Sequence, residues 1–308
     1  MSTATAPGRT GTPGAPTAGR GRGPTRRHTA ATNVVLLATA TVLVLIPFLW
    51  VISLAFTPSE DAFGAPQLLP ENPTLQNFGA AWDANLGRAL WNTAVVTVVA
   101  VLANVVFATA AGYAFAMLPF RGSTALFYGL VSTAAIPVSV TLIPLFLMAK
   151  QFPLAGGNDL LGHGGSGLLD SLGGVVLPYV IGPMNIFLAR QYFASANPDL
   201  AEAARIDGAG EVRIFTRIYL PLAKPLLAVV SIFAFTGVWD DFLWPLVVTT
   251  SAETQTVQLA LARFLASGNV QYGPLMAGAV LITLPVLAVF LFNQRAFVSG
   301  LTDGSVKG

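Results

Sequence analysis

The 308-residue sequence contains no cysteine and few charged residues. The lack of cysteine excludes disulfides, thiolate metal sites and cysteine nucleophiles, and it leaves the redox compartment unspecified. Only 10% of the residues are charged and 54% are apolar, whereas an average soluble domain has roughly 25% charged residues. The formal net charge of +2 is too small to indicate a nucleic-acid partner. The composition therefore predicts a chain that lies in a lipid bilayer.

Several apolar segments are long enough, at roughly 17 to 25 residues, to cross the ~30 Å hydrocarbon core as helices. A β-barrel would show ~10-residue segments of alternating hydrophobicity, but the stretch from Val34 to Phe56 is apolar without a period of two. The pattern predicts an all-α, polytopic membrane protein with six transmembrane helices. Their expected bounds are about 33–56, 90–118, 124–149, 174–192, 225–250 and 274–293. The fourth contains Pro178 and Pro183, so we expect it to be kinked and shielded by neighbouring helices.

Positive charge is distributed unevenly between the two sides of these spans. If the N-terminus is inside, the outer side carries only Arg88, Lys150 and Arg263 among the lysines and arginines. Cytoplasmic loops are enriched in positive residues, so both termini are expected to be cytoplasmic. Residues 1–28 contain no apolar residue larger than alanine after the first methionine, which predicts a disordered cytoplasmic tail before a transmembrane domain at 29–308. The apolar run that follows the tail is too long for a signal peptide.

The expected outer loops are about 57–89, 151–173 and 251–273. The second is rich in glycine between 156 and 167, which predicts either a loose connector or a mobile loop that rearranges when a partner docks. A glycine-rich loop can also bind phosphate. No strand precedes this loop and no GK[ST] follows it, so a Walker motif is excluded.

A polar segment at 195–222 separates the fourth and fifth expected spans and is too charged to be embedded in the bilayer. Asn197 can cap a helix, Pro198 suits the first helical position, and Gly208 can end the helix in a left-handed conformation. The segment predicts a short helix from Pro198 to Asp207 and a second helix after Gly210. The second helix is expected to present Ile214, Ile218 and Leu222 on one face. Physical chemistry alone also allows an amphipathic connector on the cytoplasmic membrane surface.

The same segment resembles a known signature. Its matching positions are Glu202-Ala203-Ala204, Asp207-Gly208-Ala209, Ile218 and Leu220-Pro221. They are similar to the EAA motif in permeases of binding-protein-dependent ATP-binding-cassette importers. The stretch Trp239 to Leu246 and the ending Gly300 to Gly308 resemble the carbohydrate-transporting, MalG-like branch. The likeness extends over about 30–308. One departure is that Asp240 and Asp241 stand where the branch usually has an asparagine, which affects the expected substrate detail and not the family.

The resemblance implies a type I ABC importer transmembrane domain (MetI/MalG-like) in a bacterial plasma membrane, forming half of the pathway for a sugar or oligosaccharide. It implies as partners a second homologous permease, two cytoplasmic ATP-binding subunits, an extracytoplasmic sugar-binding protein and membrane lipid. The chain itself is expected not to be an enzyme, and no nucleotide motif or catalytic set is found. The two histidines, His28 and His163, suggest neither a metal site nor a cofactor.

Two sets of residues carry the implied function. The resemblance assigns ATPase coupling to Glu202, Ala203, Ala204, Arg205, Asp207, Gly208, Leu220 and Pro221. Glu202 and Asp207 are expected to pair with basic groups of the ATPase. A substrate path is expected at Trp239, Asp240, Asp241 and Trp244, because carboxylates accept hydrogen bonds from sugar hydroxyls and indoles can stack on sugar rings. Alternatively, the tryptophans belong to an interfacial belt and the aspartates lie near water.

Three other functions remain open from the sequence. An importer of the same family could carry a solute that is not a sugar. An ion-coupled secondary transporter would show internal repeats with coupling-ion sites at broken helices, and no such repeat is evident. A scaffold that transports nothing is the third. Which sugar is carried cannot be read from this chain, because the binding protein sets much of the selectivity in such systems.

Overall fold

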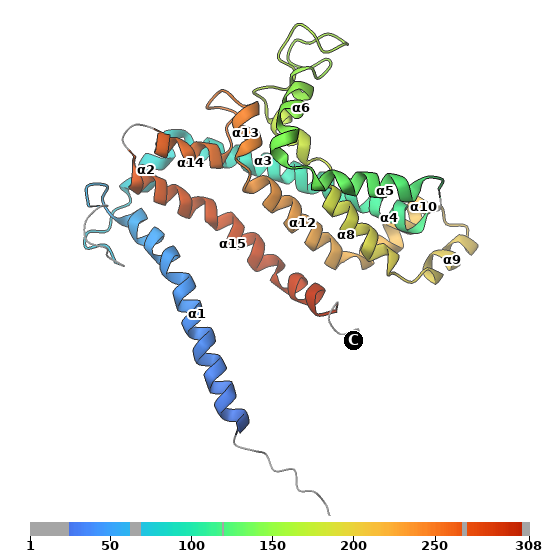
Figure 1. Cartoon of the computed structure of the whole chain (residues 1–308), viewed down its shortest axis with the longest axis horizontal. Coiled ribbons are helices and arrows are strands. Elements are labelled where there is room, and N and C mark those ends of the chain that lie inside the picture. Colours follow the sequence, from blue (N-terminus) through green and yellow to red (C-terminus); the bar gives the residue numbers. More distant parts are fainter. Residues whose placement is uncertain (1–24, 62–68, 119, 267–269, 304–308) are drawn as a thin grey trace, which may run out of the picture. The chain divides into compact units, whose positions relative to one another are not determined.

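The computed structural model describes residues 25–61, 69–118, 120–266 and 270–303, which form helices and loops without a β-strand. This confirms the predicted all-α class. In the first half of the chain (Figure 1) the helices are α1 (Thr25–Phe56), α2 (Gln76–Ala81), η1 (Trp82–Leu86), α3 (Gly87–Ala103), η2 (Asn104–Ala108), α4 (Thr109–Met117), α5 (Ser123–Ser132), η3 (Thr133–Ala135) and α6 (Val138–Lys150).

The second half of the chain is equally helical. Its helices are α7 (Leu172–Val176), η4 (Leu177–Tyr179), α8 (Pro183–Ala194), α9 (Asp199–Ile206), α10 (Glu211–Ile214), η5 (Phe215–Tyr219), α11 (Leu220–Leu222), α12 (Lys224–Trp239), α13 (Leu243–Val248), α14 (Val257–Ala266) and α15 (Tyr272–Asp303). The short elements η1, η2 and η5 are π-helical turns, and η3 and η4 are 3₁₀ turns.

The chain divides into two compact units, 1–49 and 50–308. Most of α1 belongs to the first unit, and its stretch 32–56 has a mean hydropathy of 2.6. This stretch includes the first expected span, at 33–56. The helix begins at Thr25, so it overlaps the last residues of the tail expected at 1–28. The rest of that tail, 1–24, lies outside the described residues, as do residues 304–308 of the chain's ending.

Among the described residues, the helical stretches 32–56, 76–117 and 272–294 are each long and apolar enough to cross a bilayer. Three bent helix pairs also qualify if each pair counts as one span. They are Ser123–Ala135 with Val138–Lys150, bent by 107°, Leu172–Tyr179 with Pro183–Ala194, bent by 41°, and Glu211–Leu222 with Lys224–Trp239, bent by 84°. The number of candidate spans among the described residues reaches six only when each bent pair is counted as one span. A long apolar stretch in the sequence therefore does not always form one continuous helix.

The third expected span, 124–149, is not one straight helix. It breaks between η3 and α6, where Ile136 is extended with ψ 123° and Pro137 follows. Proline has no N–H to donate and disfavours the helical conformation in the residue before it. The two halves therefore meet at 107°.

The fifth expected span, 225–250, is also shorter than predicted. Helix α12 ends at Trp239, and Asp240 to Phe242 separate it from α13. The Asp241 carboxylate accepts a hydrogen bond from the Leu243 amide at 3.0 Å. This contact forms an Asx turn just before α13, in which the aspartate side chain replaces a backbone acceptor. The acidic pair therefore marks a helix break inside an apolar stretch.

The kink expected in the fourth span is present, and a buried asparagine supports it. The Asn104 amide donates to the carbonyl of Tyr179 at 2.7 Å, and its oxygen accepts from the Gly182 amide at 2.9 Å and from Asn185 at 2.8 Å. Asn104 is only 2% exposed. A break in apolar surroundings leaves backbone groups that must find internal partners. Asn104 provides them on both sides of the break between η4 and α8.

Helices α4 and α8 make an unusually close contact, and they lie side by side in Figure 1. A Cβ atom added at Gly112 of α4 would lie 2.4 Å from the Ala189 Cβ of α8. Small residues let helix backbones approach in this way. Beside this contact lies a buried cluster, which consists of Tyr113, Ala189, Phe193, Ala201, Ile214, Tyr219, Ala223, Leu226 and Val230.

The glycine-rich loop expected at 151–173 is closed by internal hydrogen bonds and is not the loose connector that its composition suggests. Asn158 donates to the carbonyls of Lys150 and Phe152 at 2.8 and 3.0 Å and accepts from the Gly165 amide at 2.8 Å. Farther along, the Asp170 carboxylate binds the loop that follows α13. It accepts from the amides of Thr250 and Ser251 and from the hydroxyls of Ser251 and Thr254.

Gly112→Ala is expected to destabilise the protein by about 1–3 kcal/mol, because the added methyl group overpacks the contact with α8. The matched control is Gly129→Ala in α5, where nothing lies within 4 Å of the new Cβ. Thermal unfolding of both variants in detergent measures the effect. Equal unfolding temperatures for the two variants would contradict the close α4–α8 contact.

Asp170→Asn is expected to lower stability at pH 7 by about 1–2 kcal/mol, because the charge that strengthens four accepted hydrogen bonds is lost. The Thr254 hydroxyl and then the Ser251 amide hold the pKa of Asp170 well below its usual range. A lowered pKa means that the stabilisation is complete above the ordinary value of about 3.9 and disappears only as the pH falls through the lower folded value.

The measurement for Asp170→Asn is thermal unfolding between about pH 3 and 7, given the ordinary aspartate pKa. Wild type and variant should differ throughout most of this range and converge only at its acidic end or below. Asp83→Asn serves as the control, since Asp83 is an exposed aspartate. A difference that vanishes already at neutral pH would contradict the role of the charge.

Candidate functional site

The polar segment begins with the capped helix that the sequence predicts. The Asn197 side-chain oxygen accepts a hydrogen bond from the Asp199 amide at 3.0 Å. Pro198 stands just before α9, and Asp199 and Glu202 occupy its first turn. Acidic residues at this end complement the positive end of the helix dipole. Local chemistry alone therefore fixes where α9 starts.

The same helix ends at the glycine expected to stop it. Gly208 has φ +79°, and the Ala209 amide donates to the Ala204 carbonyl at 2.9 Å. A left-handed residue after a helix is most easily provided by glycine. The chain then reverses through Gly210 into α10.

The outer surface of α9 is exposed, whereas its inner surface is packed. Exposed positions include Glu202, Ala203, Asp207 and Gly208. On the other side, Ala201 is 2% exposed and belongs to the cluster that contains Tyr113 and Tyr219, and Ala204 packs against that cluster. The two adjacent alanines, Ala203 and Ala204, therefore face opposite environments.

The tip of the segment carries an apolar residue that sequence reasoning missed. Ile206 is 86% exposed and Val212 is 78% exposed. Ile206 is therefore available for contact with a partner at the exposed end of α9. The signal was available, since Ile206 is the only large apolar residue between Glu202 and Gly210.

The second half of the segment differs from the prediction, which placed Ile214, Ile218 and Leu222 on one face. Ile214 is fully buried and Ile218 is partly buried, but Leu222 is 57% exposed, and Tyr219 is 2% exposed instead. The reason is the π-helical turn at Phe215–Tyr219. Such a turn inserts one extra residue, which changes the apolar spacing from four residues to five.

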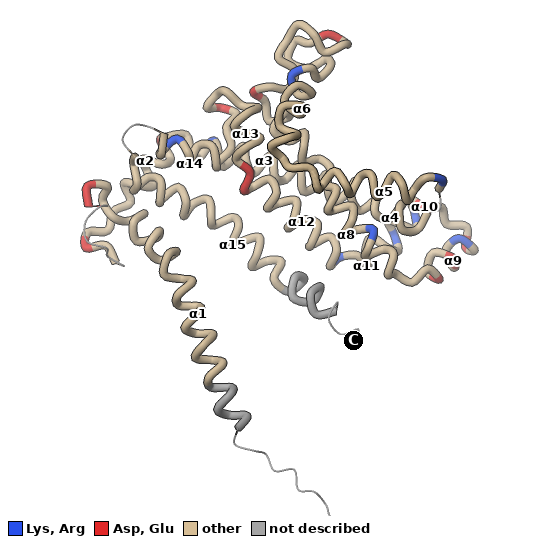
Figure 2. Tube along the Cα trace, in the orientation of Figure 1, with Lys and Arg blue, Asp and Glu red and all other residues tan. Residues whose placement is uncertain are grey.

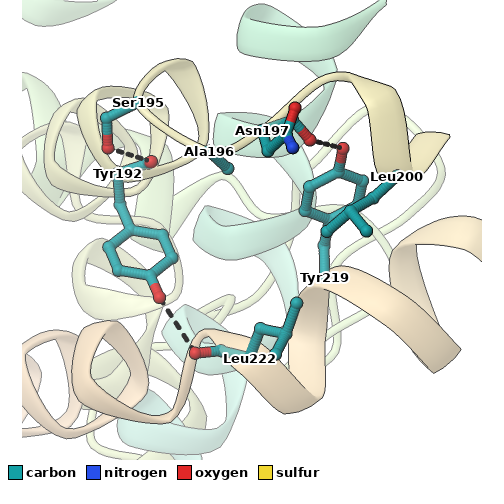
Figure 3. Close-up of a pocket in the computed structure, with 7 residues that line it drawn as sticks. All are labelled: Tyr192, Ser195, Ala196, Asn197, Leu200, Tyr219 and Leu222. Carbon is teal, nitrogen blue, oxygen red and sulfur yellow. Dashed lines mark hydrogen bonds between the residues drawn. The ribbon is translucent and has the colours of Figure 1, made fainter. Parts of the chain in front are cut away.

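Two tyrosine hydroxyls fasten this half to the helices around it (Figure 3). The Tyr219 hydroxyl donates to the Asn197 carbonyl at 2.8 Å, and the Tyr192 hydroxyl donates to the Leu222 carbonyl at 2.9 Å. Between them lies a pocket of about 280 Å³ that also includes Leu200. The pocket lies between the end of α8 and α11. Tyr192 connects α8 to α11 on one side of it, and Tyr219 connects η5 to the start of the polar segment on the other.

Charge gathers at this end of the molecule (Figure 2). The Arg205 Nε donates to Glu211 Oε1 at 2.7 Å, which joins the end of α9 to the start of α10. This hydrogen bond lowers the pKa of Glu211 and raises the pKa of Arg205. Arg205 thus closes the loop internally. Leu220 is half-buried and Pro221 is exposed, and both lie in α11 just before the 84° bend into α12.

The two tryptophans expected on a substrate path are buried within the chain. Trp239 is 3% exposed, and its indole N–H donates to the Ile282 carbonyl at 3.3 Å. Trp244 is 2% exposed and donates to the carbonyls of Gly174 and Val175 at 3.1 and 3.2 Å. Neither indole offers a free face on which a sugar ring could stack in this conformation.

The two aspartates at the same break differ from each other. Asp240 is exposed, whereas Asp241 is half-buried and accepts a hydrogen bond from the Tyr179 hydroxyl as well as from the Leu243 amide. Asp241 therefore stabilises the break, and Asp240 is the carboxylate that faces outward. Among the residues that the structure describes, no group of three or more His, Asp or Glu side chains could hold a metal ion.

Comparison with known proteins places this arrangement in a family. The family described as binding-protein-dependent transport system inner membrane component matches residues 108–303, which include the whole polar segment. The match covers more than half of the chain.

Three relatives match over most of their length. The diacetylchitobiose uptake system permease protein NgcG of Streptomyces coelicolor is 31% identical over 91% of this chain and 90% of its own. The arabinooligosaccharides transport system permease protein AraQ of Halalkalibacterium halodurans is 33% identical over 85% of this chain and 91% of its own. The galactooligosaccharides transport system permease protein GanQ of Bacillus subtilis is 31% identical over 90% of this chain and 95% of its own.

Solved structures show the same fold. One chain of a bacterial ABC transporter involved in the import of the acidic polysaccharide alginate superposes with a TM-score of 0.74 at 24% identity, covering 91% of this chain and 99% of that one. A second, from a bacterial alginate ABC transporter in complex with an alginate pentasaccharide-bound periplasmic protein, gives a TM-score of 0.60 at 15% identity, covering 86% and 93%.

Gly208→Ala is expected to destabilise the end of α9 by about 1 kcal/mol, because an L-residue is strained in the left-handed region. Gly210→Ala is the matched control, since Gly210 has φ −77°. Both glycines have open space around a new Cβ, so only backbone strain separates the two variants. Hydrogen exchange of the α9 amides should be about fivefold faster in Gly208→Ala alone. Equal exchange in both variants would contradict the assigned cap.

Proposed function

The chain belongs to the family of binding-protein-dependent transport system inner membrane components, and on that premise we propose that it forms half of the translocation pathway for a sugar or oligosaccharide. The observation that carries the proposal is the element from α9 to α11 (residues 199–222). One side of this element is charged and exposed, and the other side packs against and hydrogen-bonds to the membrane helices. A rigid element of this kind can receive a push from a partner and transmit it, which a floppy loop would not do.

The substrate class rests on the relatives. The three described above are named for diacetylchitobiose, arabinooligosaccharides and galactooligosaccharides, which share several hydroxyl groups on linked rings. Asp240 supports the same class, because an exposed carboxylate can accept hydrogen bonds from sugar hydroxyls. We assign Asp241 a supporting role beside it. Trp239 and Trp244 then form a wall behind the path and do not stack on the sugar.

The partners are proposed to be a second homologous permease, two cytoplasmic ATP-binding subunits, an extracytoplasmic sugar-binding protein and membrane lipid. The ATP-binding subunits would hydrolyse ATP, and this chain would hydrolyse nothing. Glu202 and Asp207 would pair with basic groups of an ATP-binding subunit. Ala203 and Gly208 have almost no side chain and would allow close approach. Ile206 would be the apolar anchor at the centre of that contact.

The orientation follows from the same contact. The α9–α11 element would lie in the cytoplasm, with both chain termini on that side of a bacterial plasma membrane. The distribution of lysine and arginine supports this orientation. The loop closed by Asn158 and Asp170 would then lie outside, where the sugar-binding protein arrives.

Ile206→Asp is expected to lower co-purification of the ATP-binding subunit about tenfold or more, because burial of a large apolar side chain contributes about 1.5–3 kcal/mol and an aspartate would be left without a partner. The control is Leu161→Asp, which changes a leucine of similar exposure (76%) in the outer loop. Undiminished co-purification of the Ile206 variant would contradict the anchor.

Uptake itself is tested with the importer purified through a tag on this chain and reconstituted into liposomes with a binding protein. Labelled diacetylchitobiose, arabinooligosaccharides and galactooligosaccharides are offered with and without internal ATP. Uptake should require ATP. Uptake driven by an ion gradient alone would contradict an ATP-driven importer, and ATP-dependent uptake of a different solute only would contradict the substrate class.

A further inference from the structure

Glu211 touches two helices besides its own. Its Oε1 accepts from Arg205 Nε at 2.7 Å and its Oε2 from the Arg205 guanidinium at 3.4 Å. The same Oε2 accepts from the Tyr113 hydroxyl at 3.1 Å. Arg205 lies in the last turn of α9, and Tyr113 lies in the middle of α4. One carboxylate therefore joins the exposed helix to a helix of the membrane domain, across 98 residues of sequence.

Tyr113 is held too firmly to follow Glu211 independently. The side chain is 3% exposed. The centroid of its ring lies 5.6 Å from the ring centroid of Phe193, in an edge-on arrangement. The centroids of the Phe215 and Tyr219 rings lie 5.0 and 5.5 Å away. Aromatic contacts at these distances fix the position of the ring. A displacement of Glu211 is therefore transmitted to the backbone of α4.

Helix α4 in turn cannot move without α8. Gly112, next to Tyr113, lies so close to Ala189 that no Cβ fits between the two helices. A contact without free space transmits displacement, because packed interiors have low compressibility. The Tyr113 contact thus reaches two helices of the membrane domain.

The covalent route from α9 runs through α10, η5 and α11 into α12. Along that route the rings of Phe215 and Tyr219 in η5 pack against Tyr113, but among the described residues only the hydrogen bond to Glu211 joins Tyr113 to the start of α10. We propose that Glu211 is a positioning residue that splits the motion of α9 between two routes, one along the chain into α12 and one through Tyr113 into α4 and α8. This inference rests on the proposed function. A carboxylate suits the task because its two oxygens can accept from a guanidinium and a hydroxyl together.

The proposal is tested by removing the hydrogen bond between Tyr113 and Glu211 on which the second route depends. Tyr113→Phe deletes the hydroxyl that reaches Glu211 and retains the ring that packs in the cluster. Glu211→Gln retains an acceptor and removes the charge that Arg205 pairs with. The double variant shows whether the two residues act together. Tyr128→Phe is the matched control, because it removes a hydroxyl from an exposed tyrosine of α5.

Each variant is made in the reconstituted importer, and uptake per ATP hydrolysed is measured with labelled oligosaccharide. A cysteine at Ala203, in a chain that otherwise has none, reports crosslinking to the ATP-binding subunit. Tyr113→Phe and Glu211→Gln should each lower uptake per ATP about three- to tenfold, the size expected for the net contribution of one hydrogen bond. The double variant should be no worse than the more severe single one. In Tyr113→Phe, which leaves the Arg205–Glu211 pair intact, crosslinking and thermal stability should stay at the level of Tyr128→Phe.

The outcomes separate the two proposals. Unchanged uptake per ATP in Tyr113→Phe, or losses that add in the double variant, would overturn the second route while leaving the proposed function in place. A drop in stability that matches the loss of uptake would also overturn it, since Glu211 would then only help the domain fold. A wild-type importer without ATP-dependent uptake or crosslinking would overturn the proposed function, and the second route with it.

Discussion

A backbone that leaves its helix inside an apolar environment exposes amides and carbonyls that water cannot reach, and the fold depends on how these groups are satisfied. A buried asparagine amide provides partners at one such break, and three other buried asparagines do the same for backbone at helix ends and in loops. Asn77 donates to the carbonyls at the end of α1, Asn92 to the loop after α13, Asn104 to the break before α8 and Asn158 to the loop after α6. One amide can satisfy two backbone groups at once. At the 41° bend between η4 and α8, Asn104 satisfies backbone groups on both sides of the break in this way.

These breaks also explain which parts of the fold were predictable. The apolar stretches were found because the free energy of transferring a segment into lipid depends on which residues it contains, whatever their tertiary contacts. Continuity is a different property. Pro137 indicates a break in the sequence, but the break at Asp240 depends on an Asx turn at Asp241 and on the hydroxyl of Tyr179, which is 62 residues away in sequence. Contacts of that range cannot be read from one segment.

The exposed element shows the same division between local and distant causes. The ends of α9 were predictable, because the Asn197 cap and the Gly208 turn each involve residues within a few positions. The buried face of the helical stretch from α10 to α11 was not predictable, because the π-helical turn at Phe215–Tyr219 places Tyr219 where Ile218 was expected. That turn brings the Tyr219 hydroxyl to the carbonyl of Asn197. A regular helix would place the hydroxyl elsewhere and leave the two ends of the element unconnected.

The aromatic residues of this chain therefore have a common use that their composition does not reveal. Tyr219, Trp239 and Trp244 bury an apolar ring, Tyr192 partly buries one, and each donates its one polar hydrogen to a backbone carbonyl. Such a side chain joins two helices stiffly, because the ring has few rotatable bonds and the hydrogen bond fixes its end. Tyr113 differs in that its hydroxyl reaches a carboxylate. In the proposed second route, this hydrogen bond is, among the described residues, the one side-chain link that joins the start of α10 directly to α4, so the element reaches the membrane domain through a charged group there and through backbone carbonyls elsewhere.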